Sequence, residues 1–222
     1  MDQHRKRAHG FRPKPMVRNA VLTVGVFLFG LCGCRHYQRP KYDVGEQILL
    51  MVPFRDLSVA HGHGFGESSR GKKLIESLRS WADKNGTPVY APTRDADRVV
   101  RALTDWPSNE VSPKDWERLL KGVEVDLVLL GEILEFRLKD PQSVNFYMGT
   151  VAAQFWLIRA SSGQEVYRST EIRLTYPKGT EMEPPMTDFG AKPEDIEKGL
   201  IRVLGDRIGK DLYGETTTWW DN

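Results

Sequence analysis

Apolar and polar positions in the first half of the chain follow first a strand period and then a helix period. Residues 47–54, QILLMVPF, form a continuous apolar run, which predicts a strand buried on both faces. After a glycine-rich loop, apolar residues recur at helical spacing from Ser69 and predict a helix that stops near Asn85-Gly86. Three shorter elements follow: a strand at 88–91, a helix capped by Thr93 and a helix that begins at Ser112-Pro113.

The second half of the chain predicts three long strands and a final helix. Strand patterns cover 125–138, 144–160 and 164–176, and the turn residues between them predict an antiparallel meander. Residues 194–213 carry their apolar side chains on one helical stripe. The whole order predicts an α+β fold, in which a mixed sheet containing the meander packs against helices that include the C-terminal amphipathic helix.

The first 33 residues have the pattern of a secretory signal peptide. Residues 1–18 are rich in Lys and Arg, and an uncharged apolar run extends from Ala20 to Leu31. A membrane-spanning helix needs roughly 20 apolar residues, and this run is shorter. We therefore predict a cleaved signal peptide, with an uncleaved short anchor as the alternative.

The apolar run ends in Leu31-Cys32-Gly33-Cys34, which resembles the bacterial lipobox. In that motif a leucine stands three residues before the lipidated cysteine and a small residue immediately before it. Leu31 and Gly33 thus select Cys34 over Cys32. The resemblance implies that Cys34 becomes the N-terminus of the mature chain and carries acyl chains such as palmitate. Arg35 at the next position implies an outer-membrane lipoprotein that faces the periplasm.

The charge balance changes when the signal peptide is excluded. The full chain contains 32 Lys and Arg and 30 Asp and Glu; residues 1–33 hold six of the basic and one of the acidic residues, which leaves 26 and 29. A nearly neutral domain has no electrostatic footprint for nucleic acid, so no nucleic-acid partner is predicted. One cysteine remains after processing, which rules out an intramolecular disulfide.

Four segments are expected along the chain. They are a signal peptide at 1–33, a lipidated polar tether at 34–46, a globular domain at 47–213 and a polar tail at 214–222. The tail contains Trp219 and Trp220. Exposed tryptophans are enriched in binding hot spots and at membrane interfaces, which makes the pair a candidate partner-binding site. Packing of the pair against the protein's own sheet is the alternative.

Two apolar segments and the last helix together resemble a known family. The segments are 48–58, ILLMVPFRDLS, and 125–137, VDLVLLGEILEFR, and the helix ends Lys210-Asp211-Leu212-Tyr213. They are similar to the family of the curli-export lipoprotein CsgG and the penicillin-binding-protein activator LpoB, although Val123-Glu124-Val125-Asp126 replaces the family's usual Gly-Ala-Asp. The resemblance covers about 47–213. It implies an envelope-facing accessory or assembly domain and transfers no catalytic residue.

Residues 66–72 satisfy the pattern G-x-x-x-x-G-K between a strand and a helix. A phosphate loop also needs a Ser or Thr hydroxyl after the lysine, and Lys73 stands at that position. The loop also begins a dozen residues after Phe54, whereas a nucleotide-binding turn follows its strand directly. We therefore interpret Gly66 to Lys72 as a loop leading into a solvated helix start, with phosphate or nucleotide binding as the alternative.

Other chemical constellations are weaker. His61 and His63 lack a third nearby Cys or His, so neither a metal nor another cofactor is predicted. Glu132 and Glu135 are an odd number of residues apart, which places them on opposite faces of a regular strand, and an edge or solvated position is favoured for Glu132. Asp126 is expected to cap or end the preceding turn.

The sequence favours a non-enzymatic accessory protein, anchored in the envelope through its N-terminal lipid, that binds another envelope component. One alternative is an oligomeric component of an export or assembly machine. Another is a phosphate-handling enzyme that uses Lys72. The hairpin 127–158 is long and aromatic enough to insert into a membrane, but we favour a sheet packed against helices, which explains both of its apolar faces.

Overall fold

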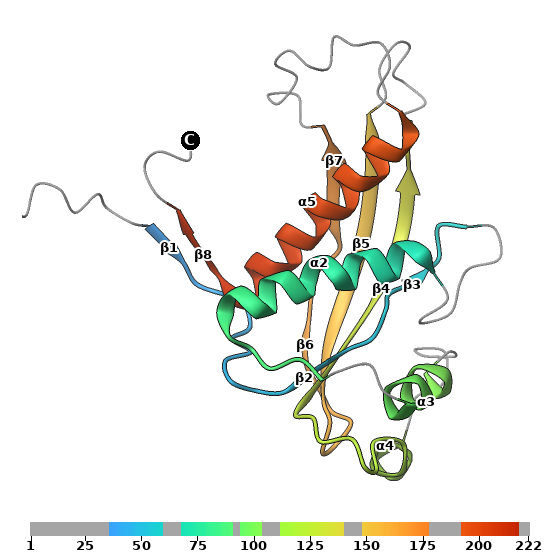
Figure 1. The fold of residues 1–222 in the computed structure, drawn as a ribbon, viewed down its shortest axis with the longest axis vertical. Helices are drawn as coiled ribbons and strands as arrows, with labels where there is room; N and C mark the ends of the chain where they lie inside the picture. Colours follow the sequence, from blue (N-terminus) through green and yellow to red (C-terminus); the bar gives the residue numbers. More distant parts are fainter. Residues whose placement is uncertain are drawn as a thin grey trace, which may run out of the picture. The chain divides into compact units, whose positions relative to one another are not determined.

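The computed structural model describes residues 36–59, 68–90, 94–103, 112–139, 148–177 and 192–217 (Figure 1). Residues 39–215 form one compact unit, whereas β1 and most of β8 belong to another. The elements in chain order are β1 (His36–Gln38), β2 (Leu49–Met51), β3 (Arg55–Asp56), α2 (Ser69–Asn85), α3 (Arg94–Ala102), α4 (Pro113–Leu119), β4 (Leu127–Arg137), β5 (Gly149–Arg159), β6 (Glu165–Arg168), β7 (Ile172–Tyr176), α5 (Pro193–Tyr213) and β8 (Glu215–Thr217).

A mixed six-stranded sheet is built around β4 and β5. These two strands pair antiparallel, from Leu127 opposite Arg159 to Arg137 opposite Thr150. Successive parts of β4 pair in parallel with β2 and β3, and successive parts of β5 pair antiparallel with β6 and β7. The predicted α+β fold, with its antiparallel meander and its C-terminal helix, is confirmed.

The strand predicted for 164–176 is divided into β6 and β7. At the division, the Ser169 backbone N–H donates to the Phe155 carbonyl oxygen at 2.9 Å. The Phe155 N–H donates in return to the Ser169 hydroxyl, also at 2.9 Å, instead of to a backbone carbonyl. The hydroxyl thus replaces one bond of the ladder, which keeps the buried N–H satisfied while the strand is interrupted.

Helices α2 and α5 lie over one face of the sheet and form the larger core with it (Figure 1). The apolar stripe predicted for α5 points into this core, and so do the apolar positions predicted for α2. The helices contribute Ile201, which is 6% exposed, and nine residues that are at most 3% exposed: Leu74, Ile75, Leu78, Ala82, Ile196, Leu200, Leu204, Ile208 and Leu212. Helical spacing alone was therefore sufficient to identify the buried side of both helices.

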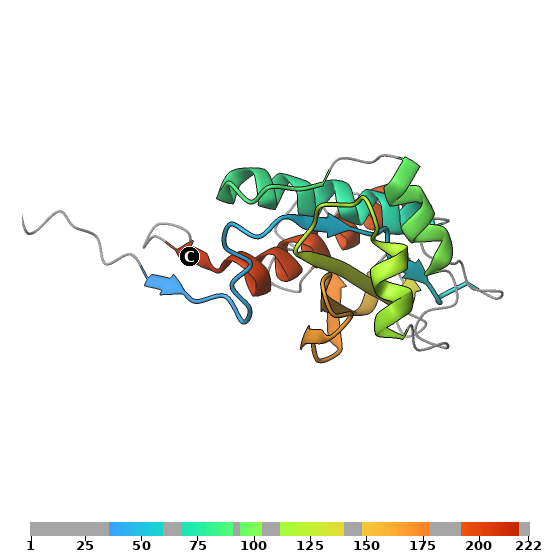
Figure 2. The same cartoon turned by 90° about the horizontal axis from the view of Figure 1, so that it is seen from below.

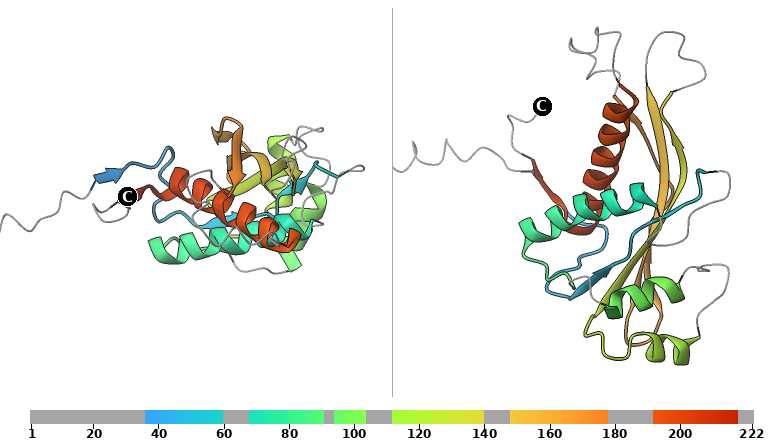
Figure 3. Two further views of the ribbon diagram at one scale, coloured as in Figure 1. Left: turned by 90° about the horizontal axis from the view of Figure 1, so that it is seen from above. Right: turned by 45° about the vertical axis from the view of Figure 1, so that its right-hand side comes forward.

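The opposite face of the sheet is covered at one end by α3 and α4, which lie where β4 begins (Figures 2 and 3). Trp116 of α4 and Val99 of α3 pack there against Val128 and Trp156 of the sheet. Both faces of β4 and β5 therefore contact protein at this end. The packed sheet that we preferred for the hairpin 127–158 is confirmed, and among the described residues no helix is long and apolar enough to cross a membrane.

A β-bulge interrupts β4 near its end. Ile133 lies opposite Ala153, but the next paired residue of β4 is Glu135, opposite Ala152. Leu134 is thus an additional residue in β4, so each residue after it points to the opposite face from the one that strict alternation predicts. The bulge therefore determines which polar side chains of β4 share a face of the sheet.

Helix α2 begins at a well-defined cap. The Ser68 hydroxyl accepts a hydrogen bond from the Gly71 N–H at 3.1 Å, and Gly86 ends the helix in the left-handed conformation. Gly71 lies directly against the backbone of Phe54, where a Cβ atom would collide with the Phe54 carbonyl oxygen. Only glycine allows α2 to approach the end of the apolar run this closely.

The segment expected to form a tether contains packed residues. Val44 is fully buried in the larger core, and the backbone N–H groups of Lys41 and Tyr42 donate to the Asp211 carbonyl oxygen of α5. Nearer the N-terminus, β1 pairs with β8 in a separate two-stranded sheet, so the first residues of the expected tail also form a strand. The packed part of the chain thus begins before residue 47.

Candidate functional site

The residues with the sharpest predicted roles lie outside the part of the chain that the structure describes. They are Leu31, Gly33, Cys34, His61, His63, Gly66, Trp219 and Trp220. Their roles stay predictions. Two groups of described polar residues meet at β3, whose adjacent residues Arg55 and Asp56 point into one group each, on opposite faces of the sheet.

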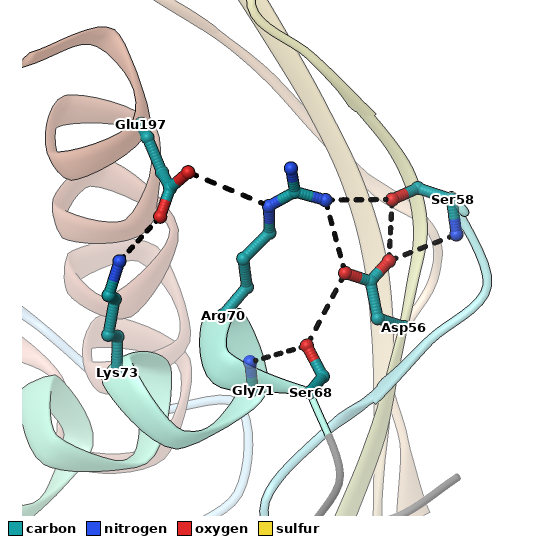
Figure 4. Close-up of polar contacts among 7 residues, drawn as sticks. All are labelled: Asp56, Ser58, Ser68, Arg70, Gly71, Lys73 and Glu197. Carbon is teal, nitrogen blue, oxygen red and sulfur yellow. Dashed lines mark hydrogen bonds and ion pairs between the residues drawn. The ribbon is translucent and has the colours of Figure 1, made fainter. Parts of the chain in front are cut away.

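The first group, the Asp56 cluster, consists of Asp56, Ser58, Ser68, Arg70 and Glu197 (Figure 4). Asp56 is 1% exposed. Its carboxylate accepts hydrogen bonds from the Ser58 backbone N–H at 3.0 Å, from the Ser68 hydroxyl at 3.3 Å and from Arg70 Nη1 at 3.2 Å, together with the Ser58 hydroxyl. The four hydrogen bonds offset the free-energy cost of removing the carboxylate from water.

Arg70 connects the Asp56 cluster to the last helix. Its guanidinium lies 4.3 Å from the centre of the Phe136 ring, and its Nε atom lies 3.9 Å from the Glu197 carboxylate. Glu197 also accepts a hydrogen bond from Lys73 at 2.6 Å. The cluster therefore ties β3, α2 and α5 together, which is the role that its contacts define.

These contacts explain the G-x-x-x-x-G-K pattern without a bound phosphate. Gly71 is required by its contact with Phe54, and Ser68 rather than an anion satisfies the Gly71 N–H. A phosphate at the start of α2 would also meet the negative charge of Asp56. The described part of the pattern thus favours our structural interpretation over phosphate binding.

The second group lies on the other face of the sheet, and we call it the polar sheet face. It is centred on Glu132 of β4, which is 3% exposed, hydrogen bonded to Arg55 of β3 and in contact with Gln154 Nε2 of β5 at 3.2 Å. Our prediction of an edge or solvated position for Glu132 was wrong. β4 is an interior strand, and Arg55 and Gln154 cover the carboxylate from its two neighbours.

Glu135 lies on the same face as Glu132, contrary to our prediction. The bulge at Leu134 adds one residue between them, so the two glutamates pair with Gln154 and Ala152, which are two residues apart on β5. Glu135 binds Arg173 of β7. The hydrogen bonds to Glu135, and then to Glu171, raise the pKa of Arg173 above its ordinary value, so this guanidinium keeps its charge.

The polar sheet face carries equal numbers of opposite charges. Its arginines and glutamates are Arg55, Arg137, Arg168, Arg173, Glu132, Glu135, Glu165 and Glu171. The pair of Arg55 and Glu132 at its centre is shielded from water, whereas Arg137 and Arg173 are more than half exposed. Such a face has no net preference for an anionic or a cationic partner.

Sequence reasoning missed the pairing at the centre of the polar sheet face. Arg55 immediately follows the apolar run at 47–54, and nothing local indicates that its partner is a glutamate 77 residues later. Asp126, which was expected to cap or end the preceding turn, accepts the Ile48 N–H at 2.8 Å and joins the starts of β2 and β4. Among the described residues, no group of three or more His, Cys, Asp or Glu is arranged to hold a metal ion.

Comparisons with known proteins gave similarities to solved structures alone. No family model matches the chain, and no curated protein matches its sequence. The chain is similar to lipoprotein GNA1162 from Neisseria meningitidis, with 16% identity, a TM-score of 0.44 and coverage of 73% of this chain and 94% of that one. For the hypothetical protein CT253 from Chlamydia trachomatis, the identity is 12%, the TM-score 0.46 and the coverage 75% and 97%.

The chain is also similar to the C-terminal domain of LpoB from Escherichia coli, with 11% identity, a TM-score of 0.37 and coverage of 59% of this chain and 84% of that one. Bacterial lipoproteins and an LpoB domain are thus among the solved structures that resemble it. With TM-scores below 0.5, these similarities carry no argument about function. The CsgG part of the predicted resemblance stays a prediction.

Proposed function

We propose that this protein is a lipid-anchored accessory protein of the cell envelope that binds another envelope component and catalyses no reaction. The observation that carries the proposal is the segment 19–34, in which an apolar run follows a basic one and ends in Leu31-Cys32-Gly33-Cys34. Acylation of Cys34 would hold the protein at the outer membrane, facing the periplasm. The lipid alone then supplies membrane attachment, at about 0.8 kcal/mol per buried methylene.

The state of the buried carboxylates supports binding over catalysis. Asp56 and Glu132 are each held by donors of the same chain, and their partners fix them in place. A general acid or base needs instead to reach a substrate proton within about 3 Å. Asp56 and Glu132 are thus engaged in maintaining the fold.

We further propose that the polar sheet face meets the partner. Arg137 and Arg173 extend into solvent beside the buried pair of Arg55 and Glu132, and ion pairs with Glu135 hold both guanidinium groups in position. A face with equal numbers of fixed positive and negative charges matches a protein surface that also carries both signs. Each charge can then pair with an opposite charge on the partner, which fixes how the two surfaces align more than it increases their affinity. A uniformly anionic polymer would be attracted and repelled in equal measure.

Site-specific photo-crosslinking in intact cells tests this proposal. A photoreactive residue is placed in the full-length chain at Arg173 and, as the matched control, at Lys198, an exposed lysine of α5. The proposal predicts a discrete crosslinked product of different composition from position 173 and none from position 198. The absence of any product from position 173 would contradict it. A product of two copies of this chain would favour the oligomeric alternative.

A further inference from the structure

The polar sheet face exposes its positive charges to solvent more than its negative ones. The side chains of Arg137 and Arg173 are 58% and 54% exposed, whereas Glu135, which binds both of them, is 21% exposed. Glu171 is the most exposed glutamate of the face, at 48%, and it is held by Arg173. The formal charges still cancel at long range. A molecule that touches this part of the face nevertheless meets guanidinium groups before carboxylates.

Arg137 uses only part of its guanidinium within the part of the chain that the structure describes. Its Nε atom lies 2.9 Å from Glu135 Oε1, and Glu135 is its one ion-pair partner among the described residues. Arg173, in contrast, binds Glu135 through Nη1 and Glu171 through Nη2. The N–H groups on Nη1 and Nη2 of Arg137 are therefore left for another acceptor. A carboxylate matches this pair of nitrogens, because its two oxygens bind both at once.

An exposed apolar side chain lies on the same face. Leu57 follows Arg55 by two residues, and its N–H donates to the Ile133 carbonyl oxygen at 2.8 Å, so the parallel pairing of β3 with β4 continues to Leu57. Alternation then places the Leu57 side chain on the face of Arg55, where it is 40% exposed. Its neighbour in the continued register is Leu134, the half-buried extra residue of the bulge. Leu57 therefore adds an exposed apolar position to the polar sheet face.

The spacing between Leu57 and Arg137 fits an extended protein segment. Leu57 lies level with Leu134, three residues before Arg137 along β4, which corresponds to about 10 Å. An extended segment covers this distance in about two to four residues, because the head of the long Arg137 side chain can shift along the strand. Among the described elements, α3 and α4 cover this face only at the other end, where β4 begins (Figure 3).

We propose that Arg137 and Leu57 bind an extended protein segment in which an Asp or Glu stands about two to four residues from an apolar side chain. This inference rests on the proposed function and deepens it by stating the chemistry of the partner. The carboxylate binds the terminal nitrogens of Arg137, and the apolar side chain covers Leu57. Because the charges of the face cancel at a distance, a polyanion gains no long-range attraction, whereas one correctly placed carboxylate gains direct charge-assisted hydrogen bonds.

Selection from a library of random peptides displayed on phage tests the proposal. The full-length protein, purified from membranes in detergent, is immobilised, and the peptides that it enriches are sequenced and synthesised. We expect enriched peptides to combine an acidic and an apolar residue at the stated spacing. Fluorescence anisotropy then measures their Kd, which should rise about tenfold for Arg137→Gln. Arg137→Lys should not restore it fully, since lysine keeps the charge but loses the planar fork. Leu57→Ser should also weaken binding.

Two exposed positions away from the face provide the controls. Arg118→Gln removes an arginine paired with Asp115 in α4, and Tyr37→Ser removes an exposed apolar side chain of β1; both should leave the Kd unchanged. In cells, Arg137→Gln should reduce the crosslinked product from position 173, whereas Arg118→Gln should not. The inference is overturned, and the proposed function kept, if that product forms equally in the Arg137→Gln variant. It is likewise overturned if no acidic peptide is enriched or if the Kd does not change. No product from position 173 in the parent protein would overturn the proposed function itself.

Discussion

The Lys41 ammonium lies 3.0 Å from the Asp211 carboxylate, across 170 residues of sequence. Asp211 is 2% exposed and also forms an ion pair with Arg207, whose Nε atom lies 3.3 Å from the carboxylate. Its backbone carbonyl oxygen accepts hydrogen bonds from the N–H groups of Lys41 and Tyr42. Asp211, near the end of α5, thus binds the segment around Lys41 through both its side chain and its backbone. Burial raises the pKa of Tyr167, the charge of Asp211 raises it further, and Arg207 opposes the change.

We expect Asp211→Ala to lower the free energy of unfolding by about 1 kcal/mol, a modest value because Lys41 and Arg207 are both partly exposed. Chemical denaturation of the mature domain measures it. Lys198→Ala on the exposed side of α5 is the control and should change stability by less than about 0.5 kcal/mol. Equal effects of the two substitutions would show that the contact between Lys41 and Asp211 contributes nothing.

Gly71→Ala should destabilise the protein by about 1 to 3 kcal/mol, although alanine favours helices more than glycine does. The new Cβ would collide with the Phe54 carbonyl oxygen, and backbone atoms at that position cannot move aside without disturbing the apolar run. Thermal unfolding compares this variant with Ser80→Ala, at an exposed position of the same helix, which should be neutral or slightly stabilising. A neutral Gly71→Ala would refute the close approach.

Arg55→Ala should cost about 3 kcal/mol, because it leaves the Glu132 carboxylate buried without its cation. The double variant Arg55→Ala/Glu132→Ala should be less destabilised than the sum of the two single variants. A double-mutant cycle measures this coupling. Arg118→Ala removes an ion pair with Asp115 in which Arg118 is 82% exposed, and it should cost less than about 1 kcal/mol. Additive effects at Arg55 and Glu132 would contradict the buried pair.

Tyr213 should make stability fall at high pH. Burial raises the pKa of Tyr213 to about 12 from an ordinary value of 10.0, with a lowering contribution from Thr87 and a further increase from Asp83. Above pH 10 the unfolded chain loses this proton before the folded protein does, so the stabilisation is complete below about pH 10 and is lost by about pH 12. The loss amounts to roughly 2 to 3 kcal/mol. The variant Tyr213→Phe should lack this fall, whereas a parallel decline in both proteins would contradict the shift.

Much of the fold was predictable, because burial leaves a periodic pattern in the sequence. The stripe of α5, the end of α2 and the antiparallel meander all depend on residues close together in the chain. The Ser112 cap and Pro113 at the start of α4 were equally local signals. A helix or strand that buries one side has apolar residues at regular intervals, and this pattern can be recognised in the sequence.

The polar sites were not predictable in the same way. A strict alternation of side chains placed Glu132 and Glu135 on opposite faces, and the extra residue Leu134 reversed that result. A bulge depends on pairing with β5, so it has no reliable local signal. Likewise, the pairing of β1 with β8 joins segments almost 180 residues apart that look like polar linkers in sequence.

Mass spectrometry of the N-terminal peptide of the protein purified from membranes tests the central claim most directly. The account predicts that the chain begins at Cys34 and carries the added mass of acyl chains. Cys32→Ser should leave this peptide's mass unchanged, whereas Cys34→Ser should abolish the modification. An unmodified peptide that begins at Met1, or acyl chains on any residue other than Cys34, would contradict the account.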